Sequence, residues 1–127
     1  MIEFSLSKES FIGGWFIKDK VCDDLIKYFN NTDDRTPGLV ENEGGLCVKK
    51  DEKDCIETGI IPISSEQAWL DYTIELKKVL DLYIKKYPEA NSVAKFGITE
   101  GTNIQYYKPG GGFKTWHSER HQKSTRH

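Results

Sequence analysis

The stretch from Asn103 to Glu119 most constrains the fold of this chain, because it joins a strand pattern, three consecutive glycines and two spaced metal-ligand side chains. It predicts a strand over 103–107, a tight turn at 109–112 and a second strand that ends near His117. In an extended segment residues i and i+2 share a face, so His117 and Glu119 can converge on one point. An imidazole nitrogen and a carboxylate oxygen are two of the three ligands in the facial triad that suits non-haem Fe(II).

The residues around the His-x-Glu pair decide how specifically the pair indicates a metal site. Alone, the pair is a weak signal, because a surface hydrogen bond or ion pair explains most such tripeptides. Here it follows Tyr-x-Pro-Gly-Gly-Gly (residues 107–112) and an aromatic. This arrangement resembles the Fe(II)- and 2-oxoglutarate-dependent dioxygenases of the prolyl 4-hydroxylase-like group, of the bacterial and phage type. The segments Phe11–Phe16 and Val21–Ile26 resemble the entry strand and first helix of that group.

The resemblance covers most of the chain and implies an α+β fold. N-terminal helices would pack on the opening strands of a double-stranded β-helix (jelly-roll, cupin-like), truncated to its front part. Residues 1–127 would form a single incomplete dioxygenase domain. Within it, 1–92 would be a helical and strand support region, and 93–127 would supply the first strands of the β-helix with the His-x-Glu motif.

The resemblance also implies a site and its cofactors. His117 and Glu119 would bind Fe(II), and Tyr107 would donate a hydrogen bond to a carboxylate of 2-oxoglutarate. The expected co-substrates are 2-oxoglutarate and O₂, with ascorbate as an optional addition, and the substrate is a peptidyl (prolyl-like) side chain or a small molecule. Tyr107 has an equally weighted alternative as a strand aromatic with a wet hydroxyl. A register slip of one residue would exchange its role with that of Tyr106.

The resemblance breaks at the distal ligands. An enzyme of this group needs a second histidine well downstream and, beyond it, an arginine or lysine for 2-oxoglutarate; neither is present. His121 lies in a polar segment typical of a loop, and His127 is the last residue. The alternative is therefore a non-catalytic, truncated β-rich interaction module, or a subunit that a partner completes. Open sheet edges in such a fragment invite self-association.

Composition limits which binding partners and which cellular compartment are expected. The formal charge of −2 and a pI near 5.9 provide no basic field for nucleic acid. No apolar run approaches the roughly 20 residues of a membrane helix, and the N-terminus lacks a signal-peptide pattern. The three cysteines, Cys22, Cys47 and Cys55, lack C-x-x-C spacing, which disfavours a structural zinc site and favours a reducing cytoplasmic setting.

Two amphipathic helices are predicted. Val21, Cys22, Leu25, Ile26 and Phe29 recur at helical spacing, with Asp19 as the expected cap and Cys22 as a small buried side chain. A longer helix follows a capping box formed by Ser64 and Gln67 and stops at Pro88. Its apolar stripe, expected to be core, consists of Trp69, Tyr72 or Thr73, Leu76, Val79, Leu80 and Tyr83.

The remaining segments are interpreted more coarsely. Residues 3–17 suggest one or two strands with a bend at Gly13-Gly14. Residues 31–58 are interpreted as a long surface connection with one short strand around 46–48, and the mixed charges at 49–54 as a solvated run. Short strands are also expected at 60–63 and 94–98.

Overall fold

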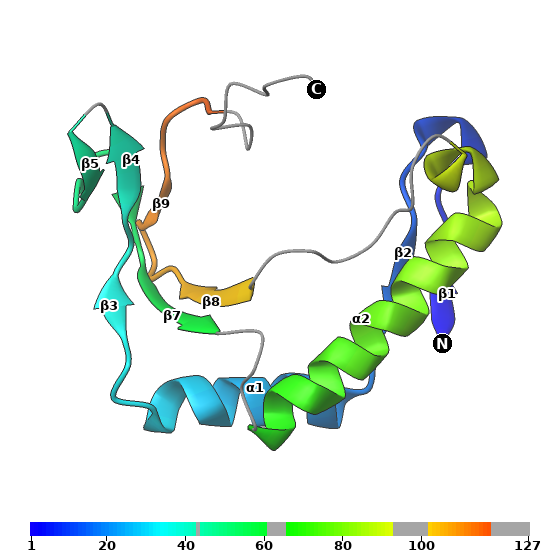
Figure 1. Cartoon of the computed structure of the whole chain (residues 1–127), viewed down its shortest axis with the longest axis horizontal. Helices are drawn as coiled ribbons and strands as arrows, with labels where there is room; N and C mark the ends of the chain where they lie inside the picture. The colour runs from blue at the N-terminus through cyan, green and yellow to red at the C-terminus, as the bar shows by residue number, and fades with distance from the viewer. Residues whose placement is uncertain (43, 61–65, 93–101, 118–127) are drawn as a thin grey trace. The chain divides into compact units, whose positions relative to one another are not determined.

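The computed structural model describes residues 1–42, 44–60, 66–92 and 102–117, and the chain forms two compact units (Figure 1). The first unit contains residues 1–33 and 59–102, and the second contains 34–58 and the chain from 103 onward. Helices lie in the first unit and most strands in the second, so the fold is mixed α+β, as predicted.

The first unit begins with an antiparallel hairpin. Strand β1 (Ile2–Phe4) pairs with β2 (Gly14–Phe16), and a short 3₁₀ helix, η1 (Lys8–Ser10), lies in the connection. The expectation of one or two strands over 3–17 is thus confirmed, and β2 starts at the second glycine of the predicted bend.

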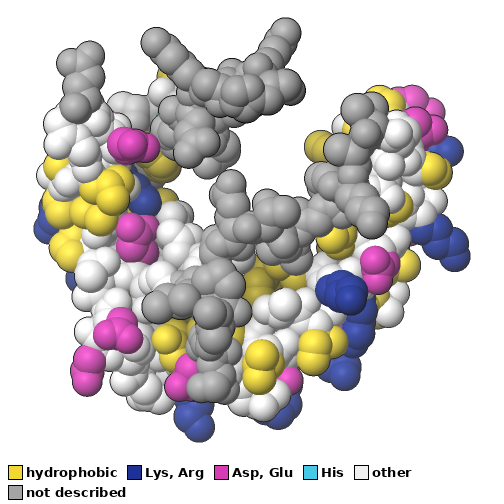
Figure 2. All heavy atoms as spheres, in the orientation of Figure 1, with side chains coloured by type: hydrophobic (Ala, Val, Ile, Leu, Met, Phe, Trp, Pro, Cys, Tyr) yellow, Lys and Arg dark blue, Asp and Glu magenta, His cyan; other side chains and the backbone are white. Residues whose placement is uncertain are grey.

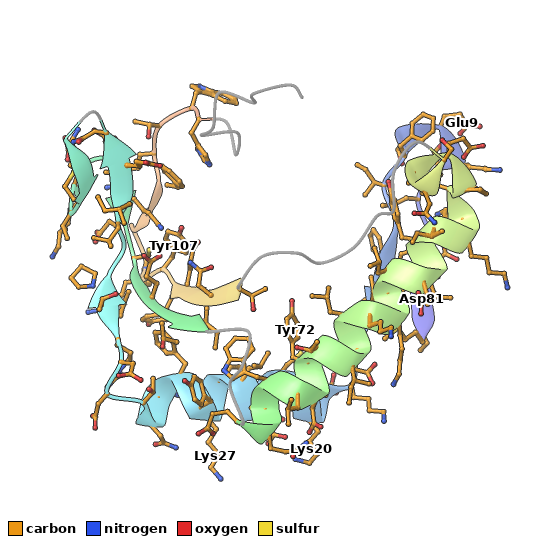
Figure 3. The ribbon with its side chains drawn as sticks, in the orientation of Figure 1. Glu9, Lys20, Lys27, Tyr72, Asp81 and Tyr107 are labelled. Atoms are coloured by element: carbon orange, nitrogen blue, oxygen red, sulfur yellow. The ribbon has the colours of Figure 1, made fainter. Side chains whose placement is uncertain are left out.

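Helices α1 (Asp19–Asn31) and α2 (Gln67–Lys86) pack through aromatic side chains, and a 3₁₀ turn, η2 (Pro88–Asn91), follows α2. Trp69 on α2 is 4% exposed, and its ring meets Tyr28 of α1 edge-to-face with 5.8 Å between centroids. The predicted stripe of α2 is therefore confirmed as core at Trp69 only; Tyr72, Leu76, Val79, Leu80 and Tyr83 are half-buried. Lysines lie on the solvent side of both helices. Lys20 and Lys27 project from α1 (Figure 3), and basic side chains lie exposed along α2 (Figure 2).

Three local predictions about these helices are wrong. Cys22 is exposed rather than buried, because the covered face of α1 is the one that carries Val21 and Phe29. Asp19 is not the cap, since Lys18 occupies the N-cap position without a side-chain hydrogen bond. The capping box is misplaced as well: Glu66 is the N-cap of α2, and the Gln67 amide donates to Asp71; Ser64 lies outside the described residues.

The end of α2 anchors the N-terminal hairpin. The Tyr83 hydroxyl donates to the carbonyl of Phe11 at 2.9 Å, and the Tyr87 hydroxyl donates to the carbonyl of Ile12 at 3.0 Å. These two bonds satisfy backbone carbonyls in the turn before β2, where helix or sheet partners are missing. They connect segments more than 70 residues apart in sequence and complete the first unit.

The second unit consists of short strands in three small sheets. A three-stranded sheet has the order β3 (Thr36–Pro37), β7 (Ile56–Ile60), β8 (Thr102–Tyr106). Strand β4 (Val40–Asn42) pairs with β5 (Gly45–Cys47), and β6 (Lys53–Asp54) pairs with β9 (Gly112–Phe113). The described strands show no double-stranded β-helix.

The interpretation of residues 31–58 as a surface connection is wrong, because the segment contains five strands; its one predicted strand, around 46–48, corresponds to β5. Its polar composition concealed the strands, whose partners lie far away in sequence.

The strand expected at 94–98 lies outside the described residues, as do residues 61–63 of the strand expected at 60–63. Residues 34–58 lie in one unit with the C-terminal strands and not with the rest of 1–92; the single incomplete domain stays a prediction.

Candidate functional site

The glycine turn places β9 against β6. Gly111 donates its backbone N–H to the carbonyl of Lys108 at 2.8 Å, and Gly110 has a φ of +83°, a conformation that glycine adopts without strain. A Cβ atom on Gly111 would lie 2.7 Å from the carbonyl oxygen of Asp54. The glycines therefore permit a close backbone approach between β9 and β6, and Phe113 comes opposite Lys53.

His117 lies just after β9 and is held by two contacts. Its imidazole stacks on Phe113, with 3.8 Å between ring centroids and 15° between planes. Its Nδ1 lies 3.1 Å from the carbonyl oxygen of Thr115. In the neutral imidazole this bond requires the proton on Nδ1, so the lone pair is on Nε2. Metal-binding histidines commonly use the same arrangement, a carbonyl on one ring nitrogen and the metal on the other.

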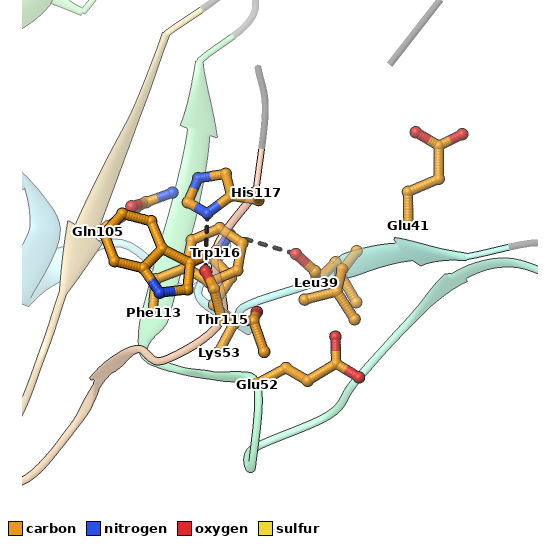
Figure 4. A pocket seen from close by; sticks show the side chains of 10 residues that line it. Leu39, Glu41, Glu52, Lys53, Gln105, Phe113, Thr115, Trp116 and His117 are labelled. Carbon is orange, nitrogen blue, oxygen red and sulfur yellow. Dashed lines mark hydrogen bonds between the residues drawn. The ribbon is translucent and has the colours of Figure 1, made fainter. Parts of the chain in front are cut away.

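His117 lines a pocket of about 380 Å³ within the second unit (Figure 4). This volume lies within the range of small-molecule sites. Strand β9 and the residues after it supply the aromatic side, including Trp116, whose side chain is 105% exposed. The other lining residues are Leu39, Val40, Glu41, Glu52, Lys53, Gln105, Phe113 and Thr115.

One residue that lines the pocket, Lys53, belongs to a buried ion pair. Lys53 and Glu57 have side chains 8% and 12% exposed, and the Lys53 Nζ donates to Glu57 Oε2 at 2.8 Å and to the carbonyl of Leu39 at 3.3 Å. Glu57 also accepts the backbone N–H of Leu39 at 3.1 Å, and the Lys53 ammonium lies 5.8 Å from the centroid of Phe113. The prediction of a solvated charge run at 49–54 is thus wrong for Lys53.

The ion pair continues into β8 and toward Tyr107. The Gln105 amide donates to Glu57 Oε2 at 3.4 Å, and the Tyr107 hydroxyl donates to Gln105 Oε1 at 2.9 Å. The side chains of Gln105 and Tyr107 therefore share a face, as expected for residues i and i+2 of an extended segment, whereas Tyr106 lines a different pocket of about 220 Å³. Burial raises the pKa of the Tyr107 phenol above its usual 10.0, and the adjacent Cys55 raises it further.

The predicted site residues are brought together only in part. His117 lines the pocket, and Tyr107 reaches one of its lining residues, Gln105, through a hydrogen bond. Glu119 lies outside the described residues, as do His121 and His127, so convergence of the His-x-Glu pair stays a prediction. Among the described side chains, no group of three metal-ligating residues is present. Of the two predicted metal ligands, the structure describes only His117, whose Nδ1 lies 3.1 Å from the carbonyl oxygen of Thr115.

Sequence reasoning missed Lys53, Glu57, Glu41 and Glu52. The signal for the first two was alternation: Lys53, Cys55 and Glu57 occupy every second position of an extended segment, and all three point inward. Glu41 and Glu52 carried no such signal, because they come to line one pocket with His117 from segments far away in sequence.

Comparison with known proteins adds no relative: no family model, curated protein or solved structure matches this chain. Within the described residues, no helix is long and apolar enough to cross a membrane.

Proposed function

We propose that this chain contributes to the active site of an Fe(II)- and 2-oxoglutarate-dependent oxygenase that hydroxylates a peptidyl (prolyl-like) or small-molecule substrate. The observation that carries the proposal is the position of His117: it lines a pocket of ligand size, and its Nδ1 lies 3.1 Å from a backbone carbonyl, a contact that in the neutral imidazole puts the lone pair on Nε2. In this proposal the small sheets of the second unit are the opening strands of a double-stranded β-helix.

The residues have distinct roles in this proposal. His117 Nε2 and the Glu119 carboxylate would hold Fe(II), and a further histidine, from another segment or from a partner, would complete the facial triad. When bound, iron with 2-oxoglutarate and O₂ supplies the oxidising power for hydroxylation. Tyr107 would exchange its bond to Gln105 for one to a 2-oxoglutarate carboxylate. A tyrosine phenol is protonated at neutral pH and can donate this bond, and burial of Tyr107 raises its pKa further.

The proposal also includes a cytoplasmic location for this protein. The three cysteines are free thiols, which agrees with the reducing cytoplasm expected from the sequence. A buried free thiol at Cys55, beside Tyr107, packs as a small apolar side chain.

Metal binding tests the proposal directly. Co(II) is titrated in place of Fe(II), and its visible absorption reports nitrogen and oxygen ligation. His117→Ala and Glu119→Ala should each lower the Co(II) affinity about ten-fold or more, because each removes a ligand. His121→Ala is the matched control and should bind Co(II) as the unmodified chain does. Equal Co(II) binding by His117→Ala would contradict the proposal; succinate formation from 2-oxoglutarate is the activity to measure next.

A second candidate is the interaction module, and the N-terminal hairpin favours it. Ile2, Phe4 and Phe16 on β1 and β2 are more than half exposed, and the two strands pair only with each other among the described strands. An exposed apolar edge of this kind associates with other strands. Sedimentation equilibrium tests this function: Phe4→Lys should reduce self-association, whereas His117→Ala should leave it unchanged.

A further inference from the structure

The pocket beside His117 has two chemically different sides (Figure 4). Phe113, Trp116 and His117 form an aromatic side that follows from β9. Glu41 on β4 and Glu52 before β6 form an acidic side, with Leu39 between them. Aromatic faces and carboxylates share one preferred ligand, a cation, because both present negative potential.

Of the aromatic side chains that line the pocket, Trp116 is the one that a ligand can contact. One face of Phe113 stacks on His117 at 3.8 Å, and the Lys53 ammonium lies 5.8 Å from the Phe113 centroid, so both partners of Phe113 come from the chain itself. Trp116 is 105% exposed, which places the largest aromatic side chain of the pocket entirely in solvent. Tryptophan is also the ring with the strongest attraction for cations.

The charges of the pocket leave an excess of negative charge. The positive charge of Lys53 is matched by Glu57 at 2.8 Å, so it does not repel a cationic ligand in full. Glu41 is exposed. Glu52 Oε1 accepts from the Lys49 ammonium at 2.8 Å, in a pair whose side chains are 39% and 32% exposed. Because both side chains are still about a third exposed, solvent partly screens this pair, and a competing ammonium group can replace Lys49.

We propose that this pocket binds the cationic side chain of a lysine or arginine in a peptide, with Trp116 against the cation and Glu41 and Glu52 as its counter-ions. The inference rests on the proposed function and names its substrate class as a basic peptide instead of a prolyl one. The Lys49–Glu52 bond shows the geometry by which a lysine ammonium meets this acidic side. The pocket volume of about 380 Å³ accommodates one long side chain.

The test uses the metal-free full chain and three blocked tripeptides with lysine, arginine or norleucine at the centre. Norleucine keeps most of the lysine stem and removes the charge. Because a single side chain binds weakly, the readout is the NMR shift of the Trp116 indole N–H during titration. The lysine and arginine peptides should shift this signal in a saturable way, and the norleucine peptide should not.

Substitutions then separate the two sides of the pocket. Trp116→Leu should weaken lysine-peptide binding about five-fold, followed in this variant through the Phe113 and His117 signals. The double variant Glu41→Gln, Glu52→Gln should weaken it about ten-fold, and added salt should weaken it further. The matched controls are Phe11→Leu and Asp81→Asn, an exposed aromatic and an exposed carboxylate of the first unit, which should leave binding unchanged.

The outcomes keep this inference distinct from the proposed function. Equal binding of the lysine and norleucine peptides, or unchanged binding in the double glutamine variant, overturns the inference. Co(II) binding is measured on the same variants, and the double glutamine variant should retain it. Loss of peptide binding with Co(II) binding intact supports the inference. Co(II) binding without any peptide binding overturns the inference alone, and peptide binding without Co(II) binding overturns the proposed function alone.

Discussion

The two units of this chain bury different kinds of side chain. The first unit buries mainly apolar groups, with Trp69, Tyr87 and Phe29 among the least exposed, and one carboxylate, Glu75, whose partner Lys78 is half exposed. The second unit buries a charged pair, Lys53 and Glu57, together with the Thr58 hydroxyl, for which the described residues provide no hydrogen-bond partner. Apolar packing tolerates local change, whereas a buried polar network is stable only when its members are satisfied together.

The difference shows where function is concentrated. A pair of charges taken out of water seldom stabilises a fold more than apolar side chains of the same volume would. The Lys53–Glu57 pair lies beneath Phe113, on which His117 stacks. The second unit thus places its costly polar interior directly under the candidate site, and the first unit contains no comparable buried pair among its described residues.

The largest expected effect is on the aromatic core of the first unit. Trp69→Ala should lower the free energy of unfolding by about 3–5 kcal/mol, because it removes the ring packed against Tyr28 and leaves a cavity. Urea denaturation measures the change. Leu70→Ala, one residue along and 46% exposed, is the control and should cost less than about 1 kcal/mol. Equal losses for the two variants would show that Trp69 is not core.

The next effect tests the polar interior of the second unit. Lys53→Met should cost about 3 kcal/mol, because Glu57 is left buried without its counter-ion. The double variant Lys53→Met, Glu57→Leu should recover most of the loss, since no unpaired charge remains. Lys50→Met, at an exposed position, should change little. A double variant less stable than Lys53→Met would disprove the isolated-pair interpretation.

A smaller effect comes from the glycine turn. Gly111→Ala should cost about 1–3 kcal/mol, because its Cβ would lie 2.7 Å from the Asp54 carbonyl and push β9 off β6. Hydrogen exchange of the Lys114 amide, which bonds to the Glu52 carbonyl at 2.7 Å, reports the same separation. Gly112→Ala is the control, since a Cβ there meets nothing within 4 Å.

The smallest effect depends on pH. The folded-state pKa of Tyr107 is raised above 10.0, so its contribution to stability is complete below about pH 10 and is lost as the pH rises through the raised pKa. Tyr107→Phe should cost about 1 kcal/mol at neutral pH through the lost bond to Gln105, and should lose less stability than the unmodified chain on alkalinisation. Tyr106→Phe should retain the full alkaline loss.

Periodicity predicted the parts of the fold that depend on neighbouring residues. Apolar spacing located α1 and α2, and the run 103–107 matched β8 within one residue. It did not predict which side of α1 is covered, because the apolar stripe is wider than the contact with α2; Cys22 and Ile26 stay outside. Burial of a helix face is decided by its partner, not by the helix alone.

The candidate site was predictable only where its residues are close in sequence. His117 and the glycine turn carry a local signature, as does the shared face of Gln105 and Tyr107. Lys53 and Glu57 lie in a segment rich in charge, where composition outweighed the alternation that places them inside. The strand residues that contact them lie on β8 and β9. A pattern among a few neighbouring residues cannot predict pairing between strands so far apart in sequence.

The pairing of β6 with β9 also governs how quickly the site forms. Lys53 lies opposite Phe113, 60 positions later in the chain, so the pair closes a long loop before any of its contacts can stabilise it. The entropy cost of closing a loop grows slowly with loop length, but it arises before any contact stabilises the pair. Pairings between distant strands therefore form late, and folding is slow. His117 should therefore acquire its stacking partner and its pocket among the last events of folding, after the aromatic helix pair has formed.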